Sequence, residues 1–144
     1  MIVDANVVIS ASLGQSRPLL QYLADRGHTL LIPFAQMREA RLVTAAQAVK
    51  VGRDGADLFG WAEELLFTIP AEQYVGLEDE ARGRLQRGGE KDWPLVALAL
   101  ASGDAIWSND RDLFGVGVVV WNSFNIRRAS AADADARFDQ DGKR

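Results

Sequence analysis

Four isolated acidic residues stand beside apolar stretches, where a strand is expected to turn into a helix. They are Asp4 after MIV, Glu39 after LLIPFAQMR, Asp92 before WPLVALALA, and Asp110 after AIWSN. In a sheet of parallel strands the carboxyl ends lie along one edge, so acids distant in sequence can meet there. Gathered carboxylates repel one another unless cations neutralise them. The pattern therefore predicts a divalent-metal site, with metal-dependent phosphodiester cleavage as its chemistry.

Each acid also has a simpler structural explanation. An aspartate at a turn or at the start of a helix accepts hydrogen bonds from free backbone amides, and Asp92 before Trp93 and Pro94 is a good helix start. The densest polar cluster is residues 108–112, SNDRD, which follows a predicted strand. The hypothesis of a metal site depends on all four acids reaching the same edge of the sheet.

Glu39 shares one side of a predicted helix with apolar residues. Those that follow it at offsets of three, four, seven and ten are Leu42, Val43, Ala46 and Val49. Positions at these offsets lie on one helix face, so we expect this stripe to face the core and Glu39 to point inward with it. An unpaired buried carboxylate is costly. Glu39 therefore needs a partner, either a cation of the site or a neighbouring base such as Arg38 or Arg41.

The composition limits the class of protein. A chain of 144 residues suits one domain with a full-sized core. The absence of cysteine excludes disulfides, thiolate zinc sites and thiol catalysis. No apolar stretch is long enough to cross a bilayer, and the N-terminus lacks the pattern of a secretion signal, so we expect a cytoplasmic protein without membrane partners.

The net charge of −4 argues against a protein that coats nucleic acid, but not against a nuclease, because two divalent ions would balance it. Two groups of bases are candidates for phosphate contacts, although solvated helix faces or loop ends explain them as well. The first group is Arg82, Arg84, Arg87 and Lys91, and the second is Arg127 and Arg128.

Apolar runs of strand length alternate with segments of helical spacing. The expected strands are residues 2–3, resuming over 7–9, then 29–32, 67–69, 105–107 and 116–121; the expected helices are 17–25, 35–51, 56–66, 71–85 and 94–101. This alternation predicts parallel strands joined by right-handed crossovers, hence an α/β protein with a three-layer α/β/α sandwich. Residues 1–128 form the expected single domain, and residues 129–144, without periodicity, a flexible tail.

The chain resembles a known family, the PIN domains (the PilT N-terminal family), and within it the VapC-type toxins. The matching segments are IVDANVVISA, LLIPFAQMREA, KDWPLVALALASGDAIWSNDRDLF and VGVVVWN, which reach from residue 1 to 124. The resemblance implies a parallel five-stranded sheet flanked by helices. It also implies ribonuclease activity that depends on Mg²⁺ or Mn²⁺.

Carried over by position, the resemblance assigns roles to seven residues. The metal-binding catalytic acids are Asp4, Glu39, Asp92 and Asp110. Asp112 occupies a further, more variable acidic position. Asn6 and Ser108 fall where members of the family place polar residues that support the acids, and Ser108 stands where threonine is common, which keeps the hydroxyl.

The resemblance also implies partners. They are an RNA substrate and, for a VapC-type toxin, a small antitoxin protein laid on apolar helix surfaces and a second copy of the chain in a homodimer. An apolar helix surface that such a partner could use is formed by Leu58, Phe59, Trp61 and Leu65. Packing within the core explains the same four residues, and we prefer that interpretation.

Three alternatives stay open beside the ribonuclease. A phosphotransfer enzyme of the haloacid dehalogenase type needs a second aspartate two residues after the first, where this chain has Asn6. A receiver-like phosphoacceptor domain needs an aspartate at the end of the third strand, where Ile69 and Pro70 stand. A non-catalytic PIN-like binding module would use the acids only as caps, and its melting temperature would not respond to magnesium.

Overall fold

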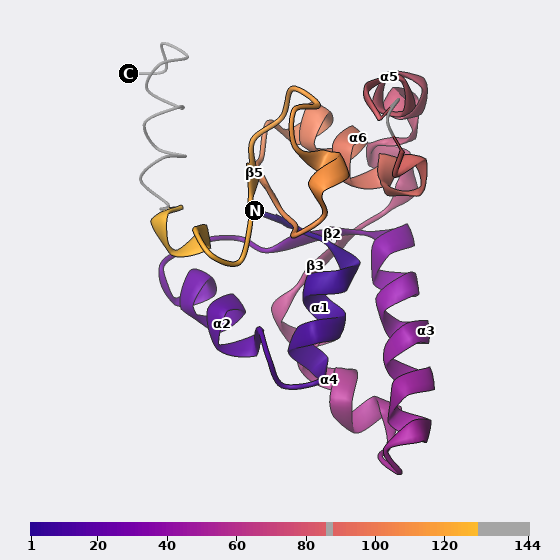
Figure 1. The fold of residues 1–144 in the computed structure, drawn as a ribbon, viewed down its shortest axis with the longest axis vertical. Coiled ribbons are helices and arrows are strands. Elements are labelled where there is room, and N and C mark those ends of the chain that lie inside the picture. Colours follow the sequence, from indigo (N-terminus) through magenta and orange to yellow (C-terminus); the bar gives the residue numbers. More distant parts are fainter. Residues whose placement is uncertain (86–87, 130–144) are drawn as a thin grey trace.

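Five short parallel strands form one sheet in the order β3-β2-β1-β4-β5. The computed structural model describes residues 1–85 and 88–129 (Figure 1). Its strands are β1 Ile2–Val3, β2 Leu31–Pro33, β3 Phe67–Ile69, β4 Ile106–Trp107 and β5 Val120–Trp121. The predicted α/β class and the parallel five-stranded sheet are confirmed. The strand order reverses between β1 and β4, where ligands bind in sheets of this type.

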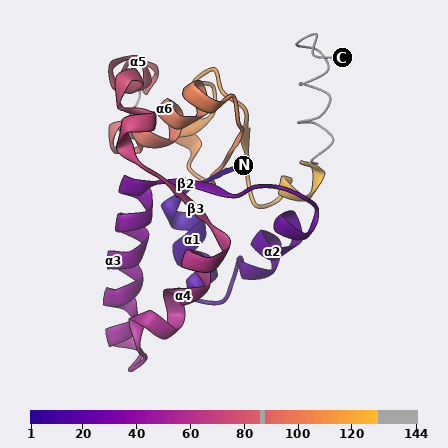
Figure 2. The same ribbon diagram turned by 180° about the vertical axis from the view of Figure 1, so that it is seen from behind.

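Helices cover both faces of the sheet (Figures 1 and 2). They are α1 Ala5–Ser12, α2 Arg17–Asp25, α3 Phe34–Lys50, α4 Gly55–Leu65, α5 Glu78–Arg84 and α6 Trp93–Ser102. Successive strand residues point to opposite faces. Val3 and Trp107 accordingly pack with α1, α2 and α4, whereas Ile2 and Ile106 pack with α5 and α6. This is the expected three-layer arrangement.

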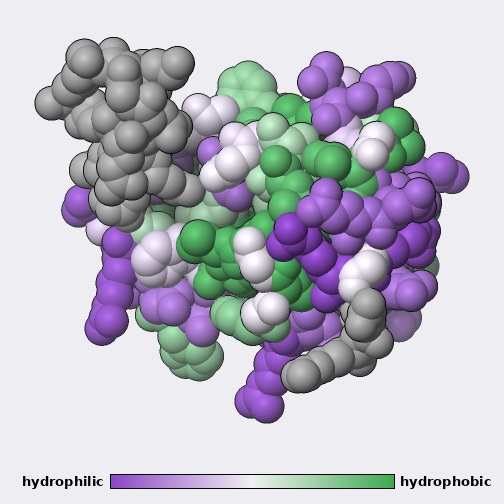
Figure 3. All heavy atoms as spheres, turned by 90° about the horizontal axis from the view of Figure 1, so that it is seen from above, coloured by the Kyte–Doolittle hydropathy of each residue, from purple (hydrophilic) through white to green (hydrophobic). Residues whose placement is uncertain are grey.

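The helix α6 is buried, as its apolar sequence predicts. Six of its ten residues, Pro94 to Ala99, are inaccessible to solvent. Seen from above, the side of the molecule that carries α5 and α6 shows a group of apolar residues beside a field of charged ones (Figure 3). The predicted core role of Leu58, Phe59 and Trp61 on α4 is also confirmed, since all three are buried.

Residues 7–9 belong to a helix, so the prediction that the first strand resumes there is wrong. Asp4 directly follows β1 and caps α1. Its side chain accepts a hydrogen bond from the backbone N–H of Asn6, in the first turn of that helix. Val7, Val8 and Ala11 then face the core at helical offsets. The apolar run reads like a strand because neighbouring elements cover this short helix on several sides.

The apolar stripe predicted on α3 points to solvent, which corrects the expectation for Glu39. Leu42 is 61% exposed and Val49 is 80% exposed. The buried face is formed by Gln36, Met37, Ala40, Thr44 and Ala48. Small residues let α3 approach α1 and α4 closely, so close packing determines which face is buried, although the opposite face is more hydrophobic.

Two further elements are shorter than predicted. Residues 71–85 divide into two 3₁₀ turns, Ala71–Gln73 and Val75–Leu77, followed by α5. Tyr74 between these turns is buried and packs on Trp93 with ring centroids 5.7 Å apart, which interrupts a continuous helix. Of the predicted strand 116–121, only Val120–Trp121 pairs with β4.

Gly117 has a φ of 87° and lies against the Arg84 guanidinium, so the chain turns there before it enters the sheet. At the far end, the Ala129 carbonyl lies 3.2 Å from Nε2 of His28. The rest of the predicted tail lies outside the described residues. Within residues 1–85 and 88–129, no helix combines the length and apolar character that a membrane span requires.

Candidate metal centre

Three of the predicted acids meet where the strand order reverses. Asp4 follows β1, and Asp110 comes shortly after the neighbouring strand β4. Asp92 closes the 3₁₀ turn Glu90–Asp92 immediately before α6. Asp4 is 2% exposed and Asp92 is 5% exposed, while Asp110 is half-buried. The sheet therefore brings together acids that lie more than a hundred positions apart in the sequence.

Ser108 joins Asp4 to Asp110. Its buried hydroxyl donates a short hydrogen bond to Oδ2 of Asp4 and accepts one from the backbone N–H of Asp110 at 3.0 Å. The other oxygen of Asp4, Oδ1, accepts the backbone N–H of Asn6 at 3.0 Å. Ser108 is therefore in contact with Asp4, and its supporting role stays a prediction from the resemblance. Asn6 supports Asp4 through its backbone, while its side chain is exposed.

Burial and mutual repulsion raise the pKa values of the two most buried acids. For Asp4, burial raises the pKa, the bonds from Ser108 and Asn6 oppose this, and the charges of Asp110 and Glu39 add to it. Burial also raises the pKa of Asp92 to about 7, helped by the charge of Asp4 and by the adjacent Asp110 carboxyl. Concentrated negative charge of this kind is what a bound cation would relieve.

Gln36 is a residue of the site that the sequence analysis missed. It is 2% exposed, and its Oε1 accepts the backbone N–H of Ala5 at 2.8 Å. Its Nε2 donates to Oδ1 of Asp92 at 3.4 Å. One amide therefore links the first turn of α3, the start of α1 and an acid of the site. The signal that could have found Gln36 is its place on the helix face that is rich in small residues. The sequence pattern predicts that the apolar stripe, and not this face, is buried.

We expect Gln36→Met to lower the free energy of unfolding by about 1–3 kcal/mol, because the buried N–H of Ala5 loses its acceptor. Urea unfolding at fixed pH measures this change. Gln47→Met, on the same helix, is the matched control, because Gln47 is half-buried and makes no side-chain hydrogen bond with another described residue. Equal changes in the free energy of unfolding of the two variants would mean that the hydrogen bonds of Gln36 do not contribute to stability.

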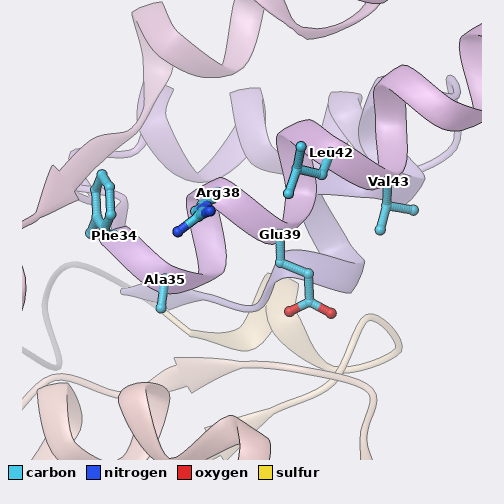
Figure 4. A pocket seen from close by; sticks show the side chains of 6 residues that line it. All are labelled: Phe34, Ala35, Arg38, Glu39, Leu42 and Val43. Atoms are coloured by element: carbon cyan, nitrogen blue, oxygen red, sulfur yellow. The ribbon is translucent and has the colours of Figure 1, made fainter.

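Glu39 lies beside the three acids and approaches them from α3. It is half-buried, and its charge is close enough to raise the pKa of Asp4. It also lines a hollow of about 490 Å³ along α3, together with Phe34, Ala35, Arg38, Leu42 and Val43 (Figure 4). Glu39 therefore lies near Asp4 although the reasoning from the apolar stripe was wrong, and its metal-binding role stays a prediction.

Asp112 lies apart from the other acids. It is exposed, and its backbone N–H donates to Oδ1 of Asp110 at 2.9 Å. Its side chain packs against the loop of Gly88 and Gly89, where a Cβ at Gly89 would lie 3.1 Å from that of Asp112. Asp112 is not among the groups that raise the pKa of Asp4 or Asp92. Its metal-binding role stays a prediction from the resemblance.

The donor atoms suit a hard divalent cation, although their spacing does not form a finished cage. Carboxylate oxygens are the ligands that Mg²⁺ and Mn²⁺ prefer, and Asp4, Asp92 and Asp110 supply them. In the described ranges 1–85 and 88–129, no three acid, histidine or cysteine side chains are arranged to hold an ion. The chemistry of the site therefore fits the implied metal, and small side-chain movements would have to complete the coordination.

Comparisons with known proteins agree with the fold described above. The fold is similar to a chain of the crystal structure of VapBC2 from Rickettsia felis bound to a DNA fragment from their promoter. The TM-score is 0.67 at 15% sequence identity, and the match covers 84% of this chain and 96% of that one. No curated protein sequence matches this chain. A family model described as the PIN domain matches residues 2–130. The chain therefore belongs to the PIN domain family.

Proposed function

We propose that the protein is a ribonuclease that hydrolyses RNA phosphodiester bonds with the help of Mg²⁺ or Mn²⁺. The observation that carries the proposal is the meeting of Asp4, Asp92 and Asp110 at the point where the strand order reverses, with raised pKa values for the two buried acids. Membership of the PIN domain family supports the same function.

The chain supplies oriented carboxylates. Ser108 and the Asn6 amide hold Asp4. Gln36 donates to one oxygen of Asp92, and the carboxyl of Asp92 also lies beside that of Asp110. Glu39 approaches from α3. A bound divalent ion would be held by these acids with Asp110, and it would supply an activated water and charge stabilisation at the phosphate.

Imidazole chemistry is not available to this site. The only histidine of the chain, His28, precedes β2 and contacts the Ala129 carbonyl, whereas the acids follow the carboxyl ends of the strands. Protons must therefore be moved by water or by the carboxyls themselves. The alternative of a dehalogenase-type phosphotransfer enzyme gains no support, because the position of its second acid holds Asn6, whose side chain is exposed.

We further propose that the protein is the toxin of a toxin–antitoxin pair, with a small antitoxin as its partner. The similar structure is of VapBC2 bound to promoter DNA, which supports this role. The outward face of α3 offers a surface for such a partner or for a second copy of the chain, because Phe34, Leu42 and Val49 are all more than half exposed. Expression alone and with the product of an adjacent small reading frame tests the pairing through cell growth.

The primary experiment is cleavage of a mixed single-stranded RNA pool by the purified chain. We expect products with Mg²⁺ or Mn²⁺ and none when EDTA removes the metal, because the carboxylates alone cannot activate water for attack on a phosphodiester. Single-stranded DNA of the same composition serves as the comparison substrate. Absence of cleavage with either metal, or equal cleavage in EDTA, would contradict the proposed function.

A further inference from the structure

Two of the four bases in the first group, Arg82 and Arg84, are occupied by structural contacts, and a third, Arg87, lies outside the described residues. Nε of Arg82 lies 3.1 Å from Glu78, its NH1 lies 3.7 Å from Glu90, and its guanidinium stacks over Trp93 at 5.5 Å. Arg84 donates to the Val116 carbonyl and to Glu80, both at 2.9 Å. These two arginines connect α5 to its surroundings and are poor candidates for phosphate contacts.

The second group lies away from the acids. Arg127 and Arg128 belong to the 3₁₀ turn Ile126–Arg128, and the next residue, Ala129, contacts His28 on the amino-terminal side of β2. The acids lie beyond the carboxyl ends of the strands. Of the described bases in these two groups, Lys91 therefore remains as a candidate for RNA contacts at the site.

Three other bases stand directly beside the acids. Arg38 precedes Glu39, Lys91 precedes Asp92, and Arg111 follows Asp110. All three bases are exposed, and none makes a side-chain hydrogen bond or ion pair with any residue in the described ranges 1–85 and 88–129. Because consecutive Cα atoms are about 3.8 Å apart, each cationic side chain starts next to an acid of the site.

The structure places these three bases on segments that carry acids of the site, namely α3, the turn before α6 and the turn after β4. Arg38 and Glu39 line the same hollow along α3 (Figure 4). Asp112 packs against Gly88 and Gly89, so the turn containing Lys91 lies beside the turn Arg111–Leu113. The acids are more buried than the bases next to them, which puts negative charge at the centre and positive charge at the edge.

We propose that Arg38, Lys91 and Arg111 form a cationic rim that binds backbone phosphates on either side of the scissile bond in single-stranded RNA. The identity of the ligand rests on the proposed function. An RNA backbone is repelled by a centre of carboxylates and by a chain of net charge −4, so its approach needs local positive charge. Exposed bases without ion-pair partners among the described residues supply it without first breaking an ion pair.

The test measures RNA binding without cleavage. In an Asp4→Asn background, a short fluorescein-labelled single-stranded RNA is titrated at several NaCl concentrations, and fluorescence anisotropy gives the dissociation constant. Log affinity falls as log salt rises, and each single substitution should make this slope shallower by about 0.7, the value for one phosphate contact on a single strand. The three substitutions are Arg38→Ala, Lys91→Ala and Arg111→Ala. Together they should make the slope shallower by about 2.

Arg53→Ala is the matched control, because Arg53 is an exposed base in the connection between α3 and α4, beyond the opposite end of α3 from Arg38. It has no side-chain partner among the described residues. Arg53→Ala should leave the slope unchanged. The proposal is overturned if the three rim variants also leave the slope unchanged, or if Arg53→Ala makes it shallower by the same amount. In the Asp4→Asn background, the free energies of unfolding of the three rim variants and of Arg53→Ala should stay within about 0.5 kcal/mol of one another, as for other surface substitutions.

The outcomes separate the rim from the ribonuclease. If the unmodified chain cleaves RNA but the rim variants bind and cleave like it, the rim is wrong and the proposed function stands. If the chain cleaves no RNA but its RNA binding depends on these bases, the ribonuclease is wrong and the rim stands. In an active background the rim variants should raise KM for RNA and leave kcat within about twofold, because they remove substrate binding that does not change at the transition state.

Discussion

Replacing Asp4 by asparagine should lower the rate of RNA cleavage by about 100-fold or more and leave the fold intact. Residues that merely orient metal ligands contribute about 10- to 100-fold, and Asp4 is proposed as a ligand itself. Asparagine has nearly the same shape, so its oxygen can still accept the backbone N–H of Asn6. Cleavage rates with Mg²⁺ or Mn²⁺, measured together with thermal melting, separate lost chemistry from lost structure.

Asp104→Asn is the matched control for this experiment. Asp104 is a half-buried acid before β4, so it lies at the opposite end of that strand from Asp110. We expect this variant to cleave RNA at the rate of the unmodified chain. A fully active Asp4→Asn protein would remove the central premise of the ribonuclease proposal, whatever the behaviour of the other acids.

The metal-free protein should lose stability as the pH rises from about 4 to about 7. The folded state raises the pKa of Asp92 from 3.8 to about 7, so between these values the folded protein holds a proton that the unfolded chain has lost. Folding stability therefore falls with rising pH through this window and levels off above it. The full effect is on the order of 4 kcal/mol, since one pKa unit corresponds to about 1.4 kcal/mol.

Urea unfolding in EDTA at several pH values measures this loss, and Asp92→Asn is the comparison. The variant has no group to titrate at this position, so the difference between the two unfolding free energies should change with pH in the stated direction. Added Mg²⁺ or Mn²⁺ should stabilise the unmodified chain most at pH 8, where the carboxylates are ionised. Parallel pH profiles for the two proteins would show that burial of Asp92 carries no such cost.

The sheet and its helices follow largely from local signals. Gly27 and Pro70 punctuate the chain, and α2 and β3 begin and end where the sequence predicts. The acids follow from topology, because the strand order brings the segments after β1 and β4 to one place. The reason given for Glu39 was wrong, because hydropathy predicts burial of a face of α3 that is exposed, and its metal-binding role stays a prediction.

The remaining parts of the site depend on tertiary contacts. Gln36 is polar and lies near a helix start, so nothing in its neighbours shows that its amide spans from Ala5 to Asp92. The grouping of Arg82 with Lys91 in sequence similarly concealed that Arg82 is paired, whereas Lys91 has no ion-pair partner among the described residues. Partners that come from separate elements cannot be read from spacing along the chain.

The bond between Ser108 and Asp4 spans 104 positions, and β1 pairs with β4 rather than with any earlier strand on that side. During synthesis on the ribosome, the amino-terminal half of the protein emerges with Asp4 but without the segment that completes the acidic centre. An unfinished nascent chain therefore has no assembled site. Whatever the acids do, they can begin only after the chain through Asp110 has left the exit tunnel and β4 has paired with β1.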